Sequence, residues 1–308
     1  MKNQRKAFLF TTLSILCWST VASAFKITLR YITPIELLAL ASLTSTVVLF
    51  LLLTLQKKLH LLRTLTPADL GLSLAMGVLS PFLYYLFVFR AYELLPAQQA
   101  QPLNMIWGIV IVILSAPLLG QKVGPRTLLA LLIAFSGVIV LSTEGDIARM
   151  NIKEPLGVGL ALASSIFWSL YWLLNTRDRR DPLLRLFLNF CFGTVFVWTA
   201  MVLFHPLRPP PLAGLLGGMY AGVFEMGLTF YFWLQALKFS RTTAKVSILV
   251  YIVPFLSLVL IHRVVGEAIL PASVAGLILI VGGILLEQTG RNGPGRPVVK
   301  DAGREPAA

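Results

Sequence analysis

Long apolar segments of about twenty residues recur along the whole chain, separated by short stretches of charged residues, prolines and glycines. Because an α-helix rises 1.5 Å per residue, such a segment can cross a hydrocarbon layer about 30 Å thick. The apolar residues run continuously instead of alternating with polar ones, which favours helices over the strands of a barrel. The pattern predicts an all-α membrane protein with ten transmembrane helices at residues 7–29, 34–55, 68–90, 96–119, 125–143, 155–175, 182–204, 212–237, 241–262 and 271–289.

Composition also indicates a membrane protein. Of the 308 residues, 57% are hydrophobic and 13% are charged, compared with about 45–50% and 25% in soluble domains. The apolar run after basic residues 1–6 has no small-residue cleavage site, so we expect a retained helix instead of a cleaved signal peptide. Residues 291–308, rich in glycine, proline and charge, are predicted to form a disordered cytoplasmic tail. The two cysteines and three histidines predict no disulfide, metal site or cofactor.

The net charge of +13 has a topological explanation. If the N-terminus is cytoplasmic, 19 of the 26 lysines and arginines fall on the cytoplasmic side of the predicted helices. Cytoplasmic loops of membrane proteins carry such an excess of positive charge. The distribution predicts a multi-pass protein of the plasma or inner membrane with both termini cytoplasmic. The basic composition is therefore not taken as a sign of nucleic-acid binding.

The two halves of the chain resemble each other weakly. Trp18-Ser19 matches Trp168-Ser169 at an offset of 150 residues, and Gly77 matches Gly222 at an offset of 145. At an offset of 146, three further residues of the first half match three of the second: Gly120, Pro125 and Gly137 against Gly266, Pro271 and Gly283. Each half has five helices, an odd number, so the second half starts on the other side of the membrane from the first. The second half must therefore be inverted relative to the first. We predict two five-helix repeats, residues 1–150 and 151–290, around a central cavity.

Several short motifs occur in an order and spacing typical of one family. They are Leu16-Cys17-Trp18-Ser19, Leu95-Pro96-Ala97-Gln98-Gln99-Ala100, Leu119-Gly120-Gln121-Lys122, Tyr251-Ile252-Val253-Pro254 and Val265-Gly266-Glu267. Over residues 7–289 the chain resembles the drug/metabolite transporter superfamily, specifically its ten-helix EamA-type members. It departs from their pattern at Ile106-Trp107-Gly108, which lacks the usual proline, and at Gln121, which replaces a common acidic residue. The resemblance implies that helices 1, 3, 4, 6, 8 and 9 surround the cavity, and that the protein exports amino acids or related metabolites.

Polar residues inside the predicted helices are candidates for the site, because polar groups in a bilayer must face a cavity, another helix or backbone. Gln98, Gln101 and Asn104 recur at i, i+3 and i+6 in the fourth helix. Such amides either line a cavity or join helices, at about 0.6 kcal/mol per bond. Further candidates are an aromatic wall and its polar neighbours: Trp18, Ser19, Tyr84, Trp168, Ser169, Ser247 and Tyr251.

Glu225 is the one acid near the middle of a predicted helix. Burying its charge costs several kcal/mol unless it is paired, hydrated or protonated. Lys245 lies only about four residues inside the ninth helix, which leaves a gap of roughly 14 Å along the membrane normal, too long for a direct pair. We therefore expect Lys245 at the cytoplasmic surface or inner mouth. Glu225 could bind a proton or a substrate ammonium group, or could be a protonated acid bonded to a neighbouring helix.

These features predict a secondary transporter of small polar or zwitterionic metabolites, an exporter of amino acids or similar compounds that works by alternating access. Two alternatives stay open. One is an exchanger of nucleotide sugars or organic phosphates, for which only Lys245 and Lys26 offer cavity cations; the other is a non-transporting assembly or lipid-handling subunit. An enzyme is not predicted, because no HExxH, GxSxG or paired intramembrane acids occur. The expected partners are a small-molecule substrate and the lipid bilayer.

Overall fold

The computed structural model describes residues 3–119, 124–146, 152–175, 177–240, 246 and 248–291. Long helices account for six of the ten predicted spans: α1 (Gln4–Thr28), α2 (Pro34–Leu55), α7 (Pro125–Ser142), α8 (Pro155–Asn175), α9 (Pro182–Phe204) and α14 (Pro271–Arg291). All of these except α1 begin at a proline, whose fixed φ and missing N–H suit the first turn of a helix. A short 3₁₀-helix, η1 (Leu59–Thr64), follows α2. The predicted tail is residues 291–308; Arg291 is the last residue of α14, and residues 292–308 lie outside the described residues.

The other four spans are each broken, where the hydrophobic pattern predicts one continuous helix. Three contain a π-helical turn: one is formed by α3 (Pro67–Gly77), η2 (Val78–Leu83) and α4 (Tyr84–Leu94), another by α10 (Leu212–Ala221), η3 (Gly222–Gly227) and α11 (Leu228–Phe239), and the third, the ninth span, ends in the π-helical turn η5 (Ile261–Val265). The fourth span is divided into α5 (Ala97–Met105) and α6 (Trp107–Leu119), and the ninth comprises η4 (Ile248–Ile252), α13 (Val253–Leu260) and η5. Such turns expose backbone groups that an unbroken helix would use internally.

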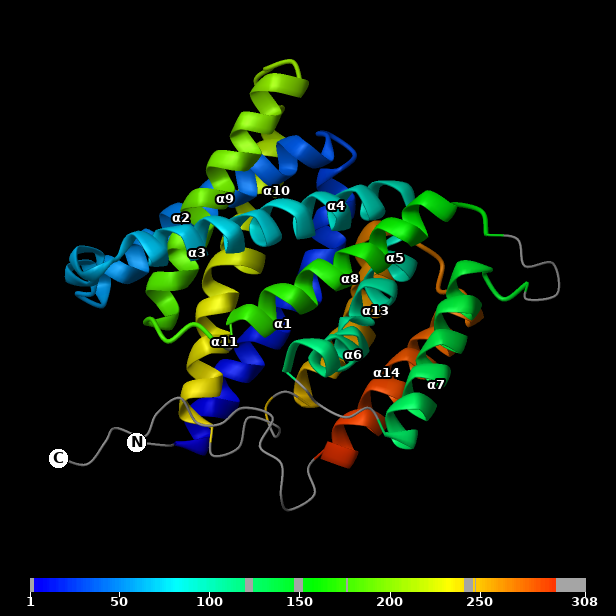
Figure 1. The fold of residues 1–308 in the computed structure, drawn as a ribbon. Helices are drawn as coiled ribbons and strands as arrows, with labels where there is room; N and C mark the ends of the chain where they lie inside the picture. Colours follow the sequence, from blue (N-terminus) through cyan, green and yellow to red (C-terminus); the bar gives the residue numbers. More distant parts are fainter. Residues whose placement is uncertain are drawn as a thin grey trace.

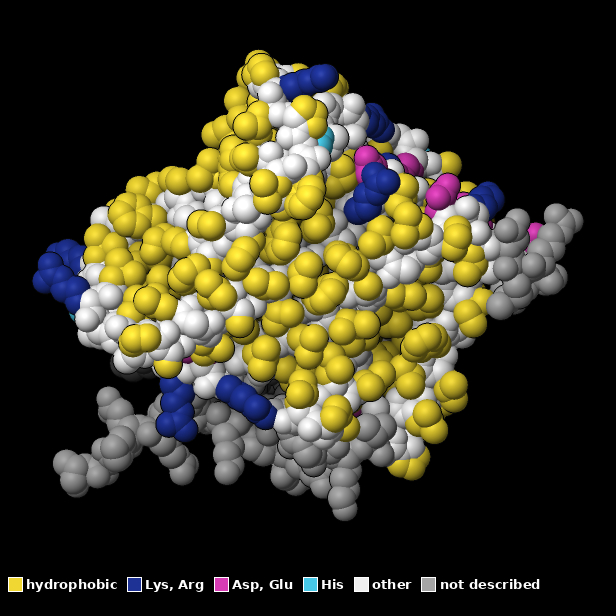
Figure 2. Space-filling view, turned by 45° about the horizontal axis from the view of Figure 1, so that its top comes forward, with side chains coloured by type: hydrophobic (Ala, Val, Ile, Leu, Met, Phe, Trp, Pro, Cys, Tyr) yellow, Lys and Arg dark blue, Asp and Glu magenta, His cyan; other side chains and the backbone are white. Residues whose placement is uncertain are grey.

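Length and hydropathy of the helices confirm a membrane protein of ten spans. In the described ranges, nine helical spans are long and apolar enough to cross a bilayer, and Leu249–Val265 is a shorter apolar helix. Figure 2 shows a broad hydrophobic surface across the middle of the molecule, with charged side chains gathered near its edges. We call the end of the bundle at which α1 begins and α14 ends the terminal side. The other end of the bundle is the opposite side.

Helix pairing places the centre of the bundle between α1, α4, α5, α8 and α11 (Figure 1). Helices α7 and α14 pack against each other at one edge of the bundle. Glycines allow this close approach: a Cβ on Gly137 would lie 2.7 Å from the carbonyl oxygen of Gly276. On the other side of the centre, α2 packs on α9 and α10.

The contact between η3 and α2 depends on glycine in the same way. A Cβ on Gly222 would lie 2.5 Å from the carbonyl oxygen of Ala41 and 2.6 Å from Cβ of Thr44. We expect Gly222→Leu to lower the free energy of unfolding by about 1–3 kcal/mol through overpacking, measured as a lower thermal midpoint in detergent. Gly71→Leu is the matched control, because a Cβ there meets nothing within 4 Å. Equal midpoints for the two variants would contradict this packing.

Candidate functional site

Glu225 lies inside η3, the π-helical turn of the eighth span, and its side chain is only 7% exposed. The hydroxyl of Tyr85 donates a hydrogen bond to its Oε1 atom at 3.1 Å. Its Oε2 atom is buried and has no hydrogen-bond partner among the described residues. Since buried carboxylate oxygens are almost always bonded, an open one indicates a place for a proton or a ligand donor.

The described groups near Glu225 carry no compensating positive charge. In the part of the chain that the structure describes, no ion pair includes Glu225. The titratable groups that interact with it electrostatically are tyrosines of α4, Tyr84, Tyr85 and Tyr92, together with Cys17 of α1. A cationic ligand group would thus meet one carboxylate in an apolar, aromatic surrounding.

Aromatic rings continue from Tyr85 across the bundle, with Trp168 of α8 at their centre. The ring of Tyr84 lies 4.6 Å from that of Tyr85 and 4.5 Å from that of Trp168, stacked on the latter. Trp168 is 7% exposed and also stacks on Tyr171 at 5.9 Å and on Phe230 at 5.7 Å. Such a wall suits flat apolar groups and, on its ring faces, cations.

Asn104 is the amide of the predicted stripe that reaches this aromatic cluster. Its Oδ1 atom accepts a hydrogen bond from the Tyr84 hydroxyl at 3.2 Å, and its Nδ2 group donates to Oγ of Ser164 at 2.8 Å. Asn104 therefore ties α5 to α4 and α8 beside the cluster. Ser169, from the predicted set, donates to its own helix and to the carbonyl of Trp107 at 3.2 Å, at the break between α5 and α6.

Gln101 and Ser19 meet at a different contact. The Gln101 amide donates to Oγ of Ser257 at 2.9 Å, and that hydroxyl donates to the carbonyl of Ser19 at 2.9 Å. The Ser19 hydroxyl itself bonds within α1. This chain of bonds joins α5, α13 and α1, so in this conformation Gln101 is engaged between helices.

Gln98 lies on the opposite side of the bundle, where a network of hydrogen bonds holds the helix ends together. The carboxylate of Glu267 accepts hydrogen bonds from the backbone N–H groups of Ala97 and Gln98, at 2.9 and 3.2 Å. The Gln98 amide bonds the backbone of Ala268 and Leu270. Beside it, Lys26 donates to the carbonyls of Tyr92 and Leu95, at 2.8 and 2.7 Å.

The remaining predicted residues lie apart from the cluster or outside the described residues. Trp18 is half-buried and packs on Trp233 of α11, with ring centroids 5.8 Å apart. Tyr251 accepts a hydrogen bond from the Gln288 amide of α14 at 2.5 Å. Lys245 and Ser247 lie outside the described residues.

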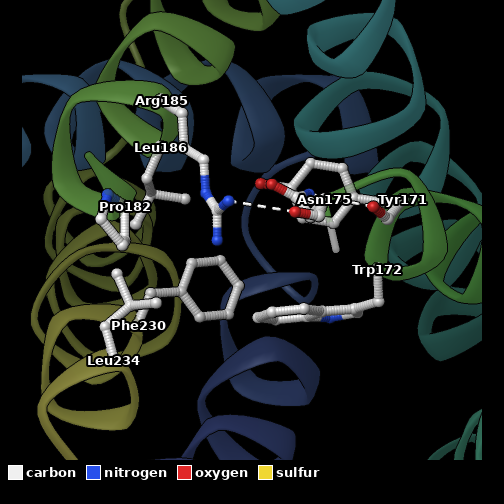
Figure 3. Close-up of a pocket in the computed structure, with 8 residues that line it drawn as sticks. All are labelled: Tyr171, Trp172, Asn175, Pro182, Arg185, Leu186, Phe230 and Leu234. Carbon is white, nitrogen blue, oxygen red and sulfur yellow. Dashed lines mark hydrogen bonds between the residues drawn. The ribbon is translucent and has the colours of Figure 1, made fainter. Parts of the chain in front are cut away.

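A hollow opens at the terminal side between α8, α9 and α11, with about 290 Å³ of empty space, part of it open solvent. Figure 3 shows the guanidinium of Arg185 reaching into it between the Phe230 ring and the end of α8. The other lining residues are Tyr171, Trp172, Asn175, Pro182, Leu186 and Leu234. Arg185 is one of the 19 lysines and arginines that the sequence assigns to the cytoplasmic side, and it lies inside the predicted helix at residues 182–204.

The loop between α8 and α9 is fixed by ion pairs beside this hollow. Arg180 binds the carboxylate of Asp178 through Nη2 at 2.6 Å and donates to Oγ of Ser73 at 2.9 Å. Lys58 binds the carboxylate of Asp181 at 2.7 Å, and Asp181 caps the first turn of α9. The loop therefore holds the start of α9 in place against α2 and α3.

Partial burial opposes ionisation of Asp178, but the hydrogen bonds from Arg180 prevail and hold the pKa of this carboxyl below its ordinary value of 3.8. A carboxyl with a lowered pKa in the folded state stabilises the fold above its unfolded pKa and loses that contribution as pH falls through the folded one. We expect Asp178→Asn to destabilise the protein by about 1–3 kcal/mol at neutral pH. Thermal midpoints measured from pH 7 downward should show the gap to wild type narrowing below about pH 4; a gap that stays constant would contradict the ion pair.

Ten membrane-spanning helices around a buried carboxylate and an aromatic wall are typical of membrane transporters for small solutes. The model of the EamA-like transporter family matches residues 5–143 and 155–287, and the chain belongs to that family. This confirms the resemblance drawn from the sequence motifs.

Individual relatives agree with this assignment. The chain is 28% identical over 210 residues to the aromatic amino acid exporter YddG of Ancylobacter novellus, an alignment that covers 67% of this chain and 72% of that protein. It is 26% identical to the uncharacterized transporter YvbV of Bacillus subtilis, over 70% of this chain and 71% of the relative. One solved crystal structure aligns with a TM-score of 0.66 and 27% identity, covering 92% of this chain and 97% of that one.

Proposed function

We propose that the protein is a secondary transporter that moves zwitterionic amino acids with aromatic or large apolar side chains across the cell membrane. The observation that carries this proposal is the buried Glu225 carboxylate, which has one oxygen without a hydrogen-bond partner among the described residues and a wall of stacked aromatic rings beside it. The carboxylate suits a substrate ammonium group, and the rings suit an aromatic or apolar side chain.

Two findings support a substrate of this kind. The relative from Ancylobacter novellus is named as an exporter of aromatic amino acids. The rings that surround Trp168 come from α4, α8 and α11, so they join both halves of the chain at one place. Asn104 beside them offers an amide to a polar substrate group once its bonds to Tyr84 and Ser164 are released.

We further propose that transport is outward and proceeds by alternating access of two inverted five-helix repeats, residues 1–150 and 151–290, with both termini cytoplasmic. The network of Glu267, Gln98 and Lys26 then closes the extracellular side, while the hollow at Arg185 faces the cytoplasm. A proton and a substrate ammonium group would compete for Glu225, which would couple export of the substrate to uptake of a proton.

A thermal-shift panel on the purified protein tests the substrate class. A ligand that binds only the folded state at 100 times its dissociation constant stabilises it by about 2.7 kcal/mol. L-phenylalanine, L-tryptophan and L-leucine should raise the thermal midpoint, whereas L-aspartate, nucleosides and sugars should not. Sugar phosphates represent the organic-phosphate alternative. Stabilisation by phosphates but by no amino acid would overturn the proposal.

A further inference from the structure

Arg185 has N–H donors that no described residue accepts. Within the described residues, both of its hydrogen bonds leave from Nη1, to the carbonyls of Asn175 at 3.0 Å and Asp178 at 2.6 Å. These bonds fix the guanidinium against the end of α8 and leave Nε and Nη2 without a described partner. Figure 3 shows the group standing among the residues that line the hollow.

The carboxylates nearest to Arg185 are engaged by other cations. Asp178 is bound by Arg180 through three of its side-chain N–H contacts, and Asp181 is bound by Lys58 while it caps α9. In the described part of the chain, no ion pair includes Arg185. A fixed, incompletely bonded guanidinium is a receptor for a planar anion, because its N–H groups match the two oxygens of a carboxylate.

The walls of the hollow select among such anions. Trp172, Phe230, Leu186 and Leu234 present apolar and aromatic surface around the guanidinium, with the Asn175 amide and the Tyr171 hydroxyl as neutral polar groups. Ordinary inorganic anions would gain nothing from these rings. An organic carboxylate attached to an aromatic or branched apolar group would bury that group against them.

The hollow also connects to the Glu225 site through consecutive ring contacts. Phe230, which lines the hollow, lies 5.7 Å from Trp168, and Trp168 lies 4.5 Å from Tyr84. Tyr84 in turn contacts Tyr85, whose hydroxyl bonds Glu225. A substrate that enters at Arg185 could therefore pass along one aromatic surface to Glu225.

We infer that Arg185 is the carboxylate-binding residue of a vestibule site, which takes the α-carboxylate of the transported amino acid while Trp172 and Phe230 hold its side chain. The inference rests on the proposed function. Recognition of the amino acid is then divided between two charges of opposite sign, the Arg185 guanidinium at the mouth of the hollow and the Glu225 carboxylate deeper in the bundle. Selectivity for a zwitterion over a simple amine would then arise at Arg185.

The test compares two substrates that differ only at the carboxylate: L-phenylalanine and L-phenylalaninol, in which a hydroxymethyl group replaces it. In proteoliposomes, the wild type should show a KM for phenylalanine about tenfold or more below that for phenylalaninol. The reason is that loss of one charge-assisted hydrogen bond weakens binding by about tenfold or more. Arg185→Gln should raise the KM for phenylalanine by about tenfold and leave that for phenylalaninol within about twofold. Arg179→Gln removes the same charge from an exposed position in the neighbouring loop and should behave as wild type.

Because Arg185 also holds the end of α8, Arg185→Gln could act through the fold alone. Arg185→Lys therefore provides a second variant, which keeps the positive charge but lacks the planar, paired N–H donors of the guanidinium. Its ratio of the two KM values should lie between those of wild type and Arg185→Gln. An equal rise of both KM values, or an unchanged ratio in both variants, would overturn the inference. Competition by inorganic phosphate that disappears in Arg185→Gln would also overturn it, because it would assign the site to phosphate. If the wild type moves neither compound, the proposed function itself fails.

Discussion

Replacing Glu225 by glutamine is expected to slow exchange of aromatic amino acids by about tenfold or more. The variant keeps the shape of the side chain and can still accept the bond from Tyr85, so the fold should persist. It loses the negative charge, and hydrogen bonds to a charged group are worth about 1.5–3 kcal/mol, with 1.4 kcal/mol for each tenfold change. The measurement is the initial rate of counterflow of labelled L-phenylalanine into proteoliposomes.

The pH profile of the same variant separates a binding role from a packing role. Since a proton and a substrate ammonium group would compete for Glu225, wild-type rates should change with pH, and the rates of Glu225→Gln should be nearly flat over the same range. Glu93→Gln is the matched control, because Glu93 lies near the end of α4 and, among the described residues, forms an ion pair with Arg90 alone. Rates and a pH profile equal to wild type in Glu225→Gln would reduce this residue to a packing role.

Trp168→Ala is expected to cause the largest loss of stability in the aromatic cluster. Removal of a buried tryptophan side chain costs about 3–5 kcal/mol, because its packing contacts are lost and a cavity remains. Trp168 packs against four aromatic rings at once, those of Tyr84, Tyr171, Trp172 and Phe230. The thermal midpoint of the purified variant gives the loss of stability.

KM values of a milder variant test whether the Trp168 ring also contributes to substrate binding. Trp168→Phe should retain most of the stability but raise the KM for aromatic substrates more than that for L-leucine, because a smaller ring offers less stacking surface. Trp18→Ala is the comparison variant, since Trp18 is only half-buried and, among the described aromatic rings, contacts that of Trp233 alone. If Trp18→Ala destabilised the protein as much as Trp168→Ala, Trp168 would not be the centre of the cluster.

The helices could be predicted from the sequence because length and hydropathy decide whether a segment can span a bilayer. The breaks within four spans could not be predicted in this way. The hydroxyl of Thr229, at the start of α11, donates to the carbonyl of Phe224 in η3, and at the break after α5 the hydroxyl of Ser169 donates to the carbonyl of Trp107. Both bonds depend on local backbone geometry or on a neighbouring helix, which a hydropathy pattern does not contain.

The polar stripe of the fourth span shows where spacing misleads. Residues at i, i+3 and i+6 drift by about 120° around a helix with 3.6 residues per turn. The structure accordingly directs the three amides to different partners: Gln98 to the loop at Ala268, Gln101 to Ser257, and Asn104 to Tyr84 and Ser164. Only Asn104 contacts the aromatic cluster, and a substrate-binding role for the other two stays a prediction.

The charge pattern of the sequence indicates a functional role for Glu225 but not for Arg185. An acid in the middle of an apolar segment stands out, because its burial costs free energy wherever the helix packs. An arginine in the first turn of a helix is indistinguishable in sequence from the many that mark a cytoplasmic end. Its exposure to a hollow arises only when α8, α9 and α11 come together, three elements from different parts of the second half.

Exchange of amino acids by the reconstituted wild-type protein tests the central claim most directly. Proteoliposomes loaded with unlabelled L-phenylalanine should take up labelled L-phenylalanine faster than protein-free liposomes. External L-tryptophan and L-leucine should compete, and L-phenylalaninol should compete more weakly. Uptake equal to that of protein-free liposomes for every amino acid, or competition by sugars and phosphates alone, would contradict the account.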